Sequence, residues 1–478
     1  MEKRKLNRRD FLRLSAGAAT GAALAACAPA APQIIEVEKE VPVKEVVVET
    51  VVVEKEVAVE KEVKVPAPAE RVKLLFWTYS VPGGEDLNEQ RVESLHEEHP
   101  EIEVESQMTG WSEYHLKLET GMAAGVMPDV FKLDWNIVPR FAYRGIPLLL
   151  SPFMDRDNID LSRYSKGAID SGRWDPKGVV TGTGPLWGWA YMTDISLIYY
   201  NKDMFRAEGL SYPSPDWTWD DFLEAAIRLT KDTTGDGKID QWGTWVLPGM
   251  QIDRPWCIWG PGGRLISEDH KKATFNSPEA IEGVRWMVEM VTKHKVSPVP
   301  GPTEVDPFQS GRVAIHPAGI WMIKAYHDVK EFEWDITMIP KHPKTGIQAG
   351  PIDSATWAIS SVSKHQDAAW EFVKDLCSAK GMEILSRVRF KVVPMAEVNE
   401  KCFFTFPEVP PGGKSLAKAL EVARPNPCWV GRQEVWGRSV GPEIEKALRG
   451  EKTVEEACEA ANVELQKSLD EAWKLSEI

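Results

Sequence analysis

The chain has 478 residues, more than one ordinary hydrophobic core supports, so two domains or lobes are expected. Its formal net charge of −15 argues against a nucleic-acid-binding protein, because such a protein needs a clustered basic face. Tryptophan is frequent, with 20 in the chain. Most of these rings are expected in cores and a few at a binding site, since indole suits both apolar packing and the C–H faces of sugars.

The first residues predict export. The pair Arg8 and Arg9 before an apolar segment resembles a twin-arginine signal. That segment, at about 15 residues, is short for a spanning helix, which needs about 20. The sequence LAAC, Leu24 to Cys27, resembles a lipoprotein box. We therefore predict a signal in 1–27 and an extracytoplasmic protein anchored to the cell membrane by a lipidated Cys27. A plain membrane anchor is the alternative and gives the same location.

A charged segment follows the signal. The unit VEKEV occurs at 37–41, 53–57 and 59–63, so charge alternates with valine throughout. Such repulsion, with flanking prolines, favours an extended linker over a folded strand. We predict that residues 28–70 are a flexible tether, with self-association of its strands as the alternative.

The next segments alternate between strand and helix patterns. Strands are predicted at 72–80, 102–109 and 129–134, and helices at 85–100 and 111–125. This alternation predicts an α/β fold with a parallel sheet, in which ligands bind beyond the carboxyl ends of strands. Four candidate ligand-binding residues lie at such ends: Trp77, Tyr79, Asp134 and Trp135.

Later helices begin with recognisable caps. The predicted caps are Thr218 before Trp219, Ser277 before Pro278, Ser363 paired with Gln366, and Thr453 paired with Glu456.

The order of these segments resembles the family 1 extracellular solute-binding proteins, the maltose-binding-like receptors of ABC importers. The matching landmarks are MPDVFKLDW, SLIYYNKDMF, WTWDDFLEAAIRLT, DTTGDGKIDQWG, FQSGRVAIHPAGIW, GPIDSATWAISSVSKHQDAAWEFVKDL and GEKTVEEACEAANVELQKSL. None is decisive alone, but their order and spacing cover nearly the whole chain after the tether.

The resemblance implies a two-lobed periplasmic-binding-protein fold with an interlobe ligand cleft and three hinge crossings. The crossings are expected near 191–197, 311–317 and 359–363. The expected N-terminal lobe comprises 71–192 plus 315–360, and the C-terminal lobe comprises 193–314 plus 361–478. Such receptors close on a solute and deliver it to the membrane permease subunits of an ABC transporter, here most simply as a monomer.

A sugar site needs aromatic plates and fixed polar groups. Beyond the four residues at strand ends, the candidates are Trp187, Trp189, Asp194, Trp256, Trp259, Trp321, Asp353 and Trp436. The resemblance itself suggests stacking roles for Trp256 and Trp436. For each tryptophan the alternative is core packing, and for each aspartate it is a cap or a salt bridge. Amphipathic helical patterns favour core packing for Trp286 and Trp370. Trp217 and Trp219 lie beside a helix cap in WTWDDF, which resembles a packing motif of the family, and this resemblance implies structural roles for both.

The segment DTTGDGKID resembles the start of a calcium loop, with Asp232, Thr234, Asp236 and Asp240 at ligand positions. The last ligand position would be Gly243, where a glutamate is expected, so a tight turn is the alternative. No cofactor is required, and structural calcium is the one metal considered. Six cysteines show no C-x-x-C pair. With Cys27 on lipid, at most two disulfides could form.

Four functions are considered. The first is a carbohydrate receptor, and the second is the same receptor for a phosphorylated polyol or other solute, using Arg254, Arg389 or Arg432. The third is an exported glycan-cleaving enzyme, which needs two carboxylates across a bond. The chain has no G-x-S-x-G motif and no marked His or Cys nucleophile arrangement, so we expect no enzyme. A purely adhesive protein would lack a closing cleft.

Overall fold

The computed structural model describes residues 71–79, 86–251, 255–301, 306–389, 391–407 and 409–477. The chain divides into a unit of Met1–Val65 and a unit of Pro66–Ile478, and the fold below is that of the second. The signal, Cys27, the tether and Arg254 lie outside the described residues, as does the side chain of Arg389. Among the described helices, none is long and apolar enough to cross a membrane.

The centre of the fold is a mixed sheet, which has nine strands in the described part of the chain, in the order β2-β1-β3-β10-β6-β8-β7. Two further strands join its middle: β11 pairs with β10, and β9 pairs with β6. The strands are β1 (Val72–Tyr79), β2 (Ile102–Thr109), β3 (Val130–Asp134), β6 (Trp189–Asn201), β7 (Trp242–Thr244), β8 (Val313–Gly319), β9 (Trp334–Met338), β10 (Pro351–Ile359) and β11 (Arg424–Pro425). A separate hairpin contains β4 (Arg173–Trp174) and β5 (Thr181–Leu186).

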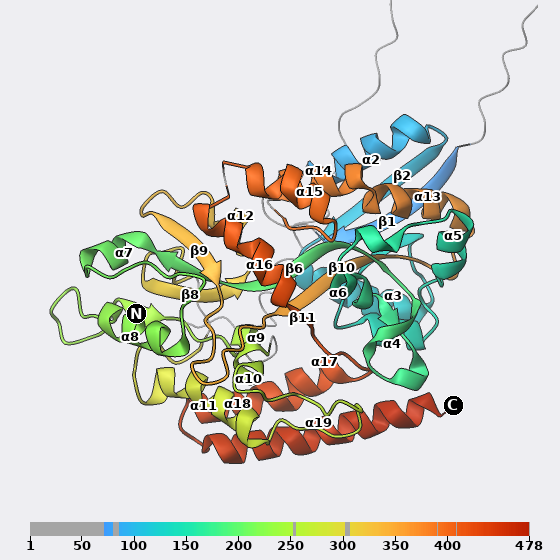
Figure 1. Cartoon of the computed structure of the whole chain (residues 1–478). Helices are drawn as coiled ribbons and strands as arrows, with labels where there is room; N and C mark the ends of the chain where they lie inside the picture. Colours follow the sequence, from blue (N-terminus) through green and yellow to red (C-terminus); the bar gives the residue numbers. More distant parts are fainter. Residues whose placement is uncertain are drawn as a thin grey trace, which may run out of the picture. The chain divides into compact units, whose positions relative to one another are not determined.

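The strand β6 belongs to both halves of this sheet. Up to Ile195 it pairs antiparallel with β10, and from Ser196 it pairs antiparallel with β8 and β9. Figure 1 shows β6 and β10 between the elements of the two halves. We call the half with β1, β2, β3 and β10 the first lobe, and the half with β7, β8 and β9 the second lobe. This change of partner strands, between Ile195 and Ser196, lies inside the predicted first crossing, 191–197.

Helices cover the first lobe through apolar faces. The cluster around Leu74, Phe76 and Trp357 includes residues of α2, α13 and α14, because β1 and β10 present their buried side chains to these helices. These and the other first-lobe helices are α2 (Leu87–Glu98), α3 (Trp111–Ala124), α4 (Val138–Tyr143), α5 (Ser151–Arg156), α6 (Lys166–Asp170), α13 (Gln366–Cys377), α14 (Ala379–Arg389) and α15 (Ala396–Lys401).

The second lobe has the larger apolar cluster, in which the long C-terminal helix packs beside α8 and α11 residues. Its helices are α7 (Lys202–Ala207), α8 (Trp219–Leu229), α9 (Pro248–Gln251), α10 (Trp256–Trp259), α11 (Pro278–Thr292), α12 (Met322–Tyr326), α16 (Leu416–Val422), α17 (Arg432–Val435), α18 (Gly441–Leu448) and α19 (Val454–Ser476). Trp219 is 3% exposed and stacks 4.4 Å from Trp286, which is the structural role expected of Trp219.

The packing corrects the predicted lobe boundaries after β6. Residues 313–338 pair with the second half of β6, so they belong to the second lobe and not to the first. Most buried residues of 366–402 contribute to the core under β1 and β10, so this segment belongs to the first lobe, while Val392 packs in the adjoining second-lobe cluster. The chain therefore crosses between β9 and β10, and again after Cys402, since Phe403 joins a second-lobe cluster. The predicted crossings at 311–317 and 359–363 are wrong.

Three of the four predicted helix caps are confirmed. Thr218 and Thr453 form capping boxes, and the Ser277 side chain accepts the N–H of Ala280. The fourth is wrong: α13 begins after His365, while the Ser363 hydroxyl donates to the Asp129 carboxylate at 2.5 Å. The same Ser363 oxygen accepts the His365 N–H at 3.1 Å, so the serine bonds the loop before α13 and does not cap the helix itself.

Candidate functional site

Buried charged side chains meet where the two lobes share β6. We call Tyr79, Lys132, Asp134, Asp194 and Lys391 the hinge cluster. The Lys391 Nζ lies 2.6 Å from Asp194 Oδ1, and the Lys132 Nζ lies 3.8 Å from Asp134 Oδ1 and 3.4 Å from the centre of the Tyr79 ring. The two ammonium side chains are 5% and 3% exposed, so these charges interact away from bulk water.

Strand register brings the acidic residues together. Asp194 on β6 lies directly opposite Asp353 on β10, and Asp134 on β3 lies opposite Ala355, two residues further along β10. Residues two apart on a strand share a face, so the three carboxylates belong to one face of the sheet. Like charges directly opposite each other destabilise a strand pair. The Lys391 ammonium group donates a hydrogen bond to Asp194 and so offsets this repulsion locally.

The environment shifts the pKa values of these groups. Burial lowers the pKa of Lys132 to about 7, against the attraction of Asp134 and Asp194 and assisted by repulsion from Lys391. Burial acts to raise the pKa of Asp134, but the Lys132 charge and hydrogen bonds from His115 and Tyr79 lower it to about 2. Asp134 is therefore an anion at neutral pH, fixed as a hydrogen-bond acceptor.

A β-bulge adds an aromatic ring beside this face. The register between β6 and β10 shifts at Tyr191, which leaves this residue as the extra one. Its ring stacks on Trp357 at 4.3 Å, and the Arg91 guanidinium lies 5.4 Å from the Tyr191 ring. The Lys132 Nζ lies 5.7 Å from that same ring. Tyr191 thus packs between the α2 side of the core and the hinge cluster.

The second lobe contributes two tryptophans at the border between the lobes. Trp321 follows β8, and its ring lies 5.7 Å from Lys391 Nζ. The ring packs on Gly319, where an added Cβ would lie 1.9 Å from a ring carbon, so glycine is required there. The buried Arg432 guanidinium lies 4.7 Å from the Trp135 ring of the first lobe and 5.4 Å from the Trp436 ring of the second.

The family of the chain follows from comparison with known proteins. Residues 85–383, well over half of the chain, match the family model for bacterial extracellular solute-binding proteins. The chain belongs to this family. This confirms the family resemblance of the sequence.

Solved structures with the same fold cover most of this solute-binding protein. A Listeria monocytogenes ABC substrate-binding protein in complex with cycloalternan matches with a TM-score of 0.74 and 24% identity, over 84% of this chain and 99% of that one. A Bdellovibrio bacteriovorus MalE domain bound to maltotriose matches with a TM-score of 0.67 and 20% identity, over 84% and 99%. The architecture is therefore the two-lobed periplasmic-binding-protein fold.

The sequence relatives match over a smaller part of the chain. The sn-glycerol-3-phosphate-binding periplasmic protein UgpB of Shigella flexneri is 25% identical over 161 residues. The match spans 33% of this chain and 36% of that relative's length. The UgpB of Escherichia coli K12 matches over the same shares at 25% identity.

Other predicted ligand-binding tryptophans of this solute-binding protein lie in cores. Trp189 is 1% exposed and stacks on Trp370, while Trp256 is 2% exposed and lies 5.7 Å from Trp286. Trp259 and Trp77 are also buried, at 6% and 7%. Trp77, Trp189 and Trp256 pack in clusters of single lobes, and Trp259 is buried, so we leave these four rings out of the proposed ligand contacts.

Trp187 has an intermediate position. It is half-buried beside the first-lobe cluster of Phe131 and Phe141, and its Nε1–H donates to the Trp174 carbonyl at 2.8 Å. Its polar edge is therefore already bonded within the first lobe.

Several site residues were missed at the sequence level. They are Arg91, Lys132, Tyr191 and Lys391. The one available signal was Lys132, a charged residue inside the otherwise apolar strand VFKLD, because an unpaired lysine is rarely buried. Lys391 carried no such signal, since its partner Asp194 is 197 residues away.

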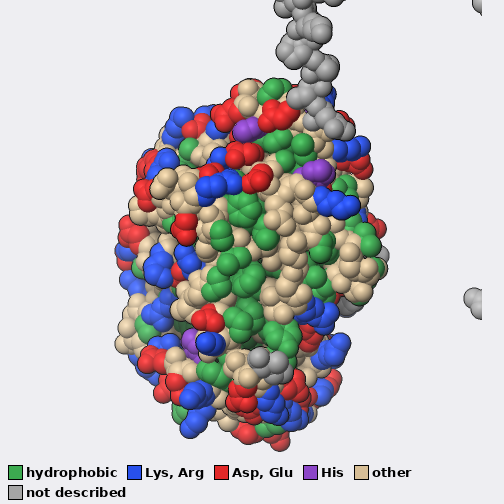
Figure 2. All heavy atoms as spheres, turned by 90° about the vertical axis from the view of Figure 1, so that its right-hand side faces the viewer, with side chains coloured by type: hydrophobic (Ala, Val, Ile, Leu, Met, Phe, Trp, Pro, Cys, Tyr) green, Lys and Arg blue, Asp and Glu red, His purple; other side chains and the backbone are tan. Residues whose placement is uncertain are grey.

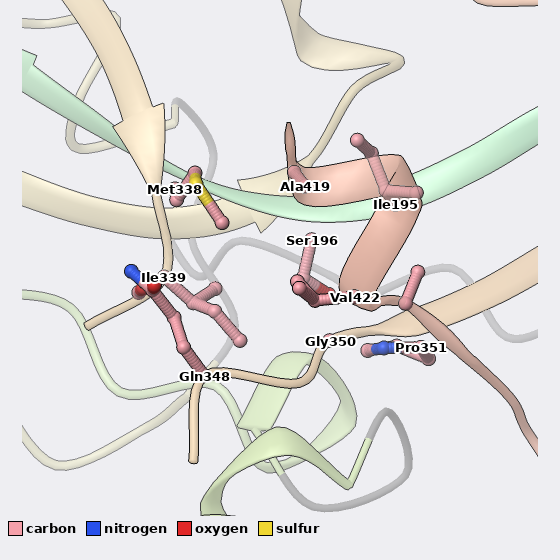
Figure 3. A pocket seen from close by; sticks show the side chains of 10 residues that line it. Ile195, Ser196, Met338, Ile339, Gln348, Gly350, Pro351, Ala419 and Val422 are labelled. Carbon is pink, nitrogen blue, oxygen red and sulfur yellow. The ribbon is translucent and has the colours of Figure 1, made fainter. Parts of the chain in front are cut away.

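A small apolar pocket lies behind the hinge (Figure 3). Its lining comes from β6, β9, β10 and α16, including Ile195, Ser196, Met338 and Val422. The volume is about 10 Å³, enough for the centre of about one water. A wider hollow of about 470 Å³ lies on the first lobe between Tyr164 and Gly184. Polar groups lining it are already paired, as Lys166 is with Asp170.

The calcium-like loop uses its carboxylates for its own backbone. Asp232 accepts the N–H groups of Gly235 and Gly237 at 2.6 and 2.7 Å, and Asp240 accepts the Thr233 N–H at 2.9 Å. Across the described residues, no group of three or more His, Cys, Asp or Glu side chains is arranged to hold a metal ion. The contacts correspond to the tight turn considered as the alternative, and calcium binding stays a prediction. The five described cysteines are buried, and none of them forms a disulfide within the described residues.

A lysine variant tests the electrostatics of the hinge cluster. Between pH 7 and about 10.4, the native state has lost the Lys132 proton while the unfolded chain retains it. The unfolded chain then binds more protons, so this group makes stability rise with pH across that window, by up to about 1.4 kcal/mol per pH unit. We expect Lys132→Met to remove this rise. Urea unfolding of both proteins at pH 7, 8 and 9 measures it, and equal slopes would contradict the assignment.

Proposed function

We propose that this protein is an extracytoplasmic receptor, anchored by lipid on Cys27, that captures a carbohydrate between its lobes and delivers it to an ABC transporter permease. The observation that carries the proposal is the hinge cluster, whose fixed carboxylates and ammonium groups lie where both lobes share β6. Sugar hydroxyls both donate and accept, and buried polar groups of both kinds recognise them.

The ion pairs of the cluster favour a neutral ligand. Lys391 is paired with Asp194 and Lys132 lies near Asp134, so both lysines already have a carboxylate of the protein beside them and neither depends on an anionic solute. Aromatic rings are available at the border of the lobes, in Trp135, Trp321 and Trp436. Such rings provide flat apolar surfaces for the C–H faces of sugars.

The structural relatives support the same ligand class. Their structures contain cycloalternan, maltotriose and, in a protein from Thermotoga lettingae at a TM-score of 0.69, alpha-D-tagatose. Membership in the extracellular solute-binding family agrees with capture outside the cytoplasm. These likenesses support the receptor role without fixing the sugar.

Ligand screening tests the carbohydrate. We expect a rise in melting temperature and a change in tryptophan fluorescence with at least one of maltose, maltotriose, mannotriose, tagatose and glucose. A ligand at a hundred times its Kd stabilises by about 2.7 kcal/mol, which is readily measured. Glycerol 3-phosphate is run beside them. A response to no sugar but a clear response to another solute would overturn the carbohydrate assignment.

A second candidate ligand is a phosphorylated polyol. Two observations favour it: the partial match to glycerol-3-phosphate-binding proteins, and the buried Arg432 between Trp135 and Trp436. An arginine can bind a phosphate with two parallel hydrogen bonds. If the protein binds glycerol 3-phosphate and Arg432→Lys weakens that binding at least tenfold, this candidate is supported over a neutral sugar.

A separate incubation tests the glycan-cleaving alternative. Recovery of each sugar unchanged after long incubation with the protein would exclude it.

A further inference from the structure

The β4–β5 hairpin extends from the first lobe. At its base, Arg173 pairs with Leu186, and Leu186 belongs to the first-lobe core. The Trp187 Nε1–H bond to the Trp174 carbonyl fixes the hairpin to the chain that leads into β6. The base of the hairpin is therefore part of the first lobe.

The tip of the hairpin is buried in the second lobe. Val179 and Val180 are 1% and 3% exposed, and both belong to the apolar cluster that contains Leu465 and Leu469 of α19. The two valines have no place in the first-lobe clusters among the described residues. Separating the lobes with the base in place would expose both valines, which is unfavourable in proportion to the apolar area exposed.

Hydrogen bonds continue this contact along the second-lobe segment 428–434. The Thr181 N–H donates to the Cys428 carbonyl at 2.8 Å, and the Cys428 N–H donates to the Thr181 hydroxyl at 3.2 Å. Beside them, the Asn136 amide donates to Gln433 at 2.7 Å, and Arg140 pairs with Glu434. The contact thus includes two first-lobe segments, the hairpin tip and the start of α4.

The backbone at the tip is strained. Val179 has φ 63° and ψ −43°, in the region that a β-branched residue adopts rarely. Residues held in such conformations persist where the surrounding packing requires them, and they concentrate in segments that switch. Here the requirement is the burial of the Val179 side chain in the second-lobe cluster.

We propose that the tip, residues 179–181, is a latch that holds the lobes together by docking into the second lobe. The latch acts through residues outside the hinge cluster, so it works with or without a bound solute. Docking buries Val179 and Val180, and opening releases the backbone strain at Val179. The latch therefore contributes to the population of the closed state in the free protein, and ligand binding raises that population further.

A disulfide reports the docked state. In full-length protein carrying Thr181→Cys, we expect diamide to join the introduced thiol to Cys428, because the two residues already exchange hydrogen bonds. Peptide mass spectrometry measures the rate of this product. The other described cysteines are buried, and wild-type protein controls for any reaction of Cys428 alone. Absence of the product in the folded variant would overturn the proposal.

Loosening the tip should slow the disulfide. Added to the Thr181→Cys protein, Val180→Asp is expected to lower the rate at least tenfold, and Val180→Ala about threefold. The matched control is Val362→Ser, at a valine that is 64% exposed at the end of β10, and it should leave the rate unchanged. Circular dichroism shows that each variant is folded. If Val180→Ala in folded protein reacts as fast as the control, the tip does not hold the lobes together.

Discussion

Replacing Trp189 with alanine is expected to lower the free energy of unfolding by about 3–5 kcal/mol, as for other large-to-small changes in cores. The ring is 1% exposed, lies 5.7 Å from Trp370 at an angle of 17° and contacts Tyr164 at 5.6 Å. No neighbouring element can move in fully, because the cluster lies between β6 and α13. Urea unfolding followed by circular dichroism measures the loss.

The affinity for any sugar identified in the screen should change less than threefold in this variant at a temperature where it is folded. A matched control is Trp111→Ala, whose ring is 52% exposed on α3, and its stability should change by less than about 1 kcal/mol. A Trp189→Ala protein with unchanged stability and much weaker sugar binding would show that Trp189 faces the ligand instead.

Removing the Asp194 carboxylate is expected to have the largest effect at the hinge cluster. Lys391 is 5% exposed and 2.6 Å from Asp194, so Asp194→Ala leaves a buried ammonium without this partner. Such a change costs about 3–5 kcal/mol of stability. If the carboxylate also binds sugar hydroxyls, affinity should fall at least a hundredfold. Calorimetry with the responding sugar and urea unfolding measure the two quantities separately.

A double variant distinguishes binding from stability. Asp194→Asn with Lys391→Met removes both charges, and replacing a buried pair with uncharged groups is often neutral or stabilising. We expect its stability to recover toward the wild-type value while sugar binding stays weak. Recovery of both would mean that the pair acts on binding only through the fold, and would contradict a direct contact of Asp194 with the sugar.

The local elements were accessible from the sequence because local rules determine them. The strand at 102–109 and the capping boxes at Thr218 and Thr453 follow from side-chain alternation and cap chemistry alone. The sequence did not predict which lobe β8 and α13 belong to. That depends on the strand with which β8 pairs and on the strands against which α13 packs. An apolar strand pattern is the same for either half of the sheet.

The residues of the candidate site also divide into those that the local sequence identified and those that depend on the fold. Position at the end of a strand identified Asp134, and Asp194 followed from the expected hinge. The sequence did not distinguish core tryptophans from those near the hinge cluster. Trp189 and Trp321 both lie among small and apolar residues, yet the Trp189 ring stacks in a core and the Trp321 ring lies beside Lys391. Pairs such as Lys391 and Asp194 can be recognised only in the folded structure, because residues so distant in sequence give no local pattern.

One face of the molecule carries a group of hydrophobic side chains. On the face shown in Figure 2, hydrophobic side chains gather along the middle, with charged side chains around them. On the first lobe, the exposed apolar residues of β2, α3 and α4 include Met108, Trp111, Leu116 and Tyr143. A variant that removes the charge around such a region would be more prone to self-association.

The shared strand β6 has a consequence for how the protein folds and comes apart. Its 13 residues run through both halves of the sheet without an intervening loop, with β10 and β8 as its flanking partners. A chain cut within β6 would remove an inner strand from both lobes at once. Neither lobe expressed alone should therefore be stable, and thermal unfolding of the whole chain should be one cooperative transition, even though the fold has two lobes.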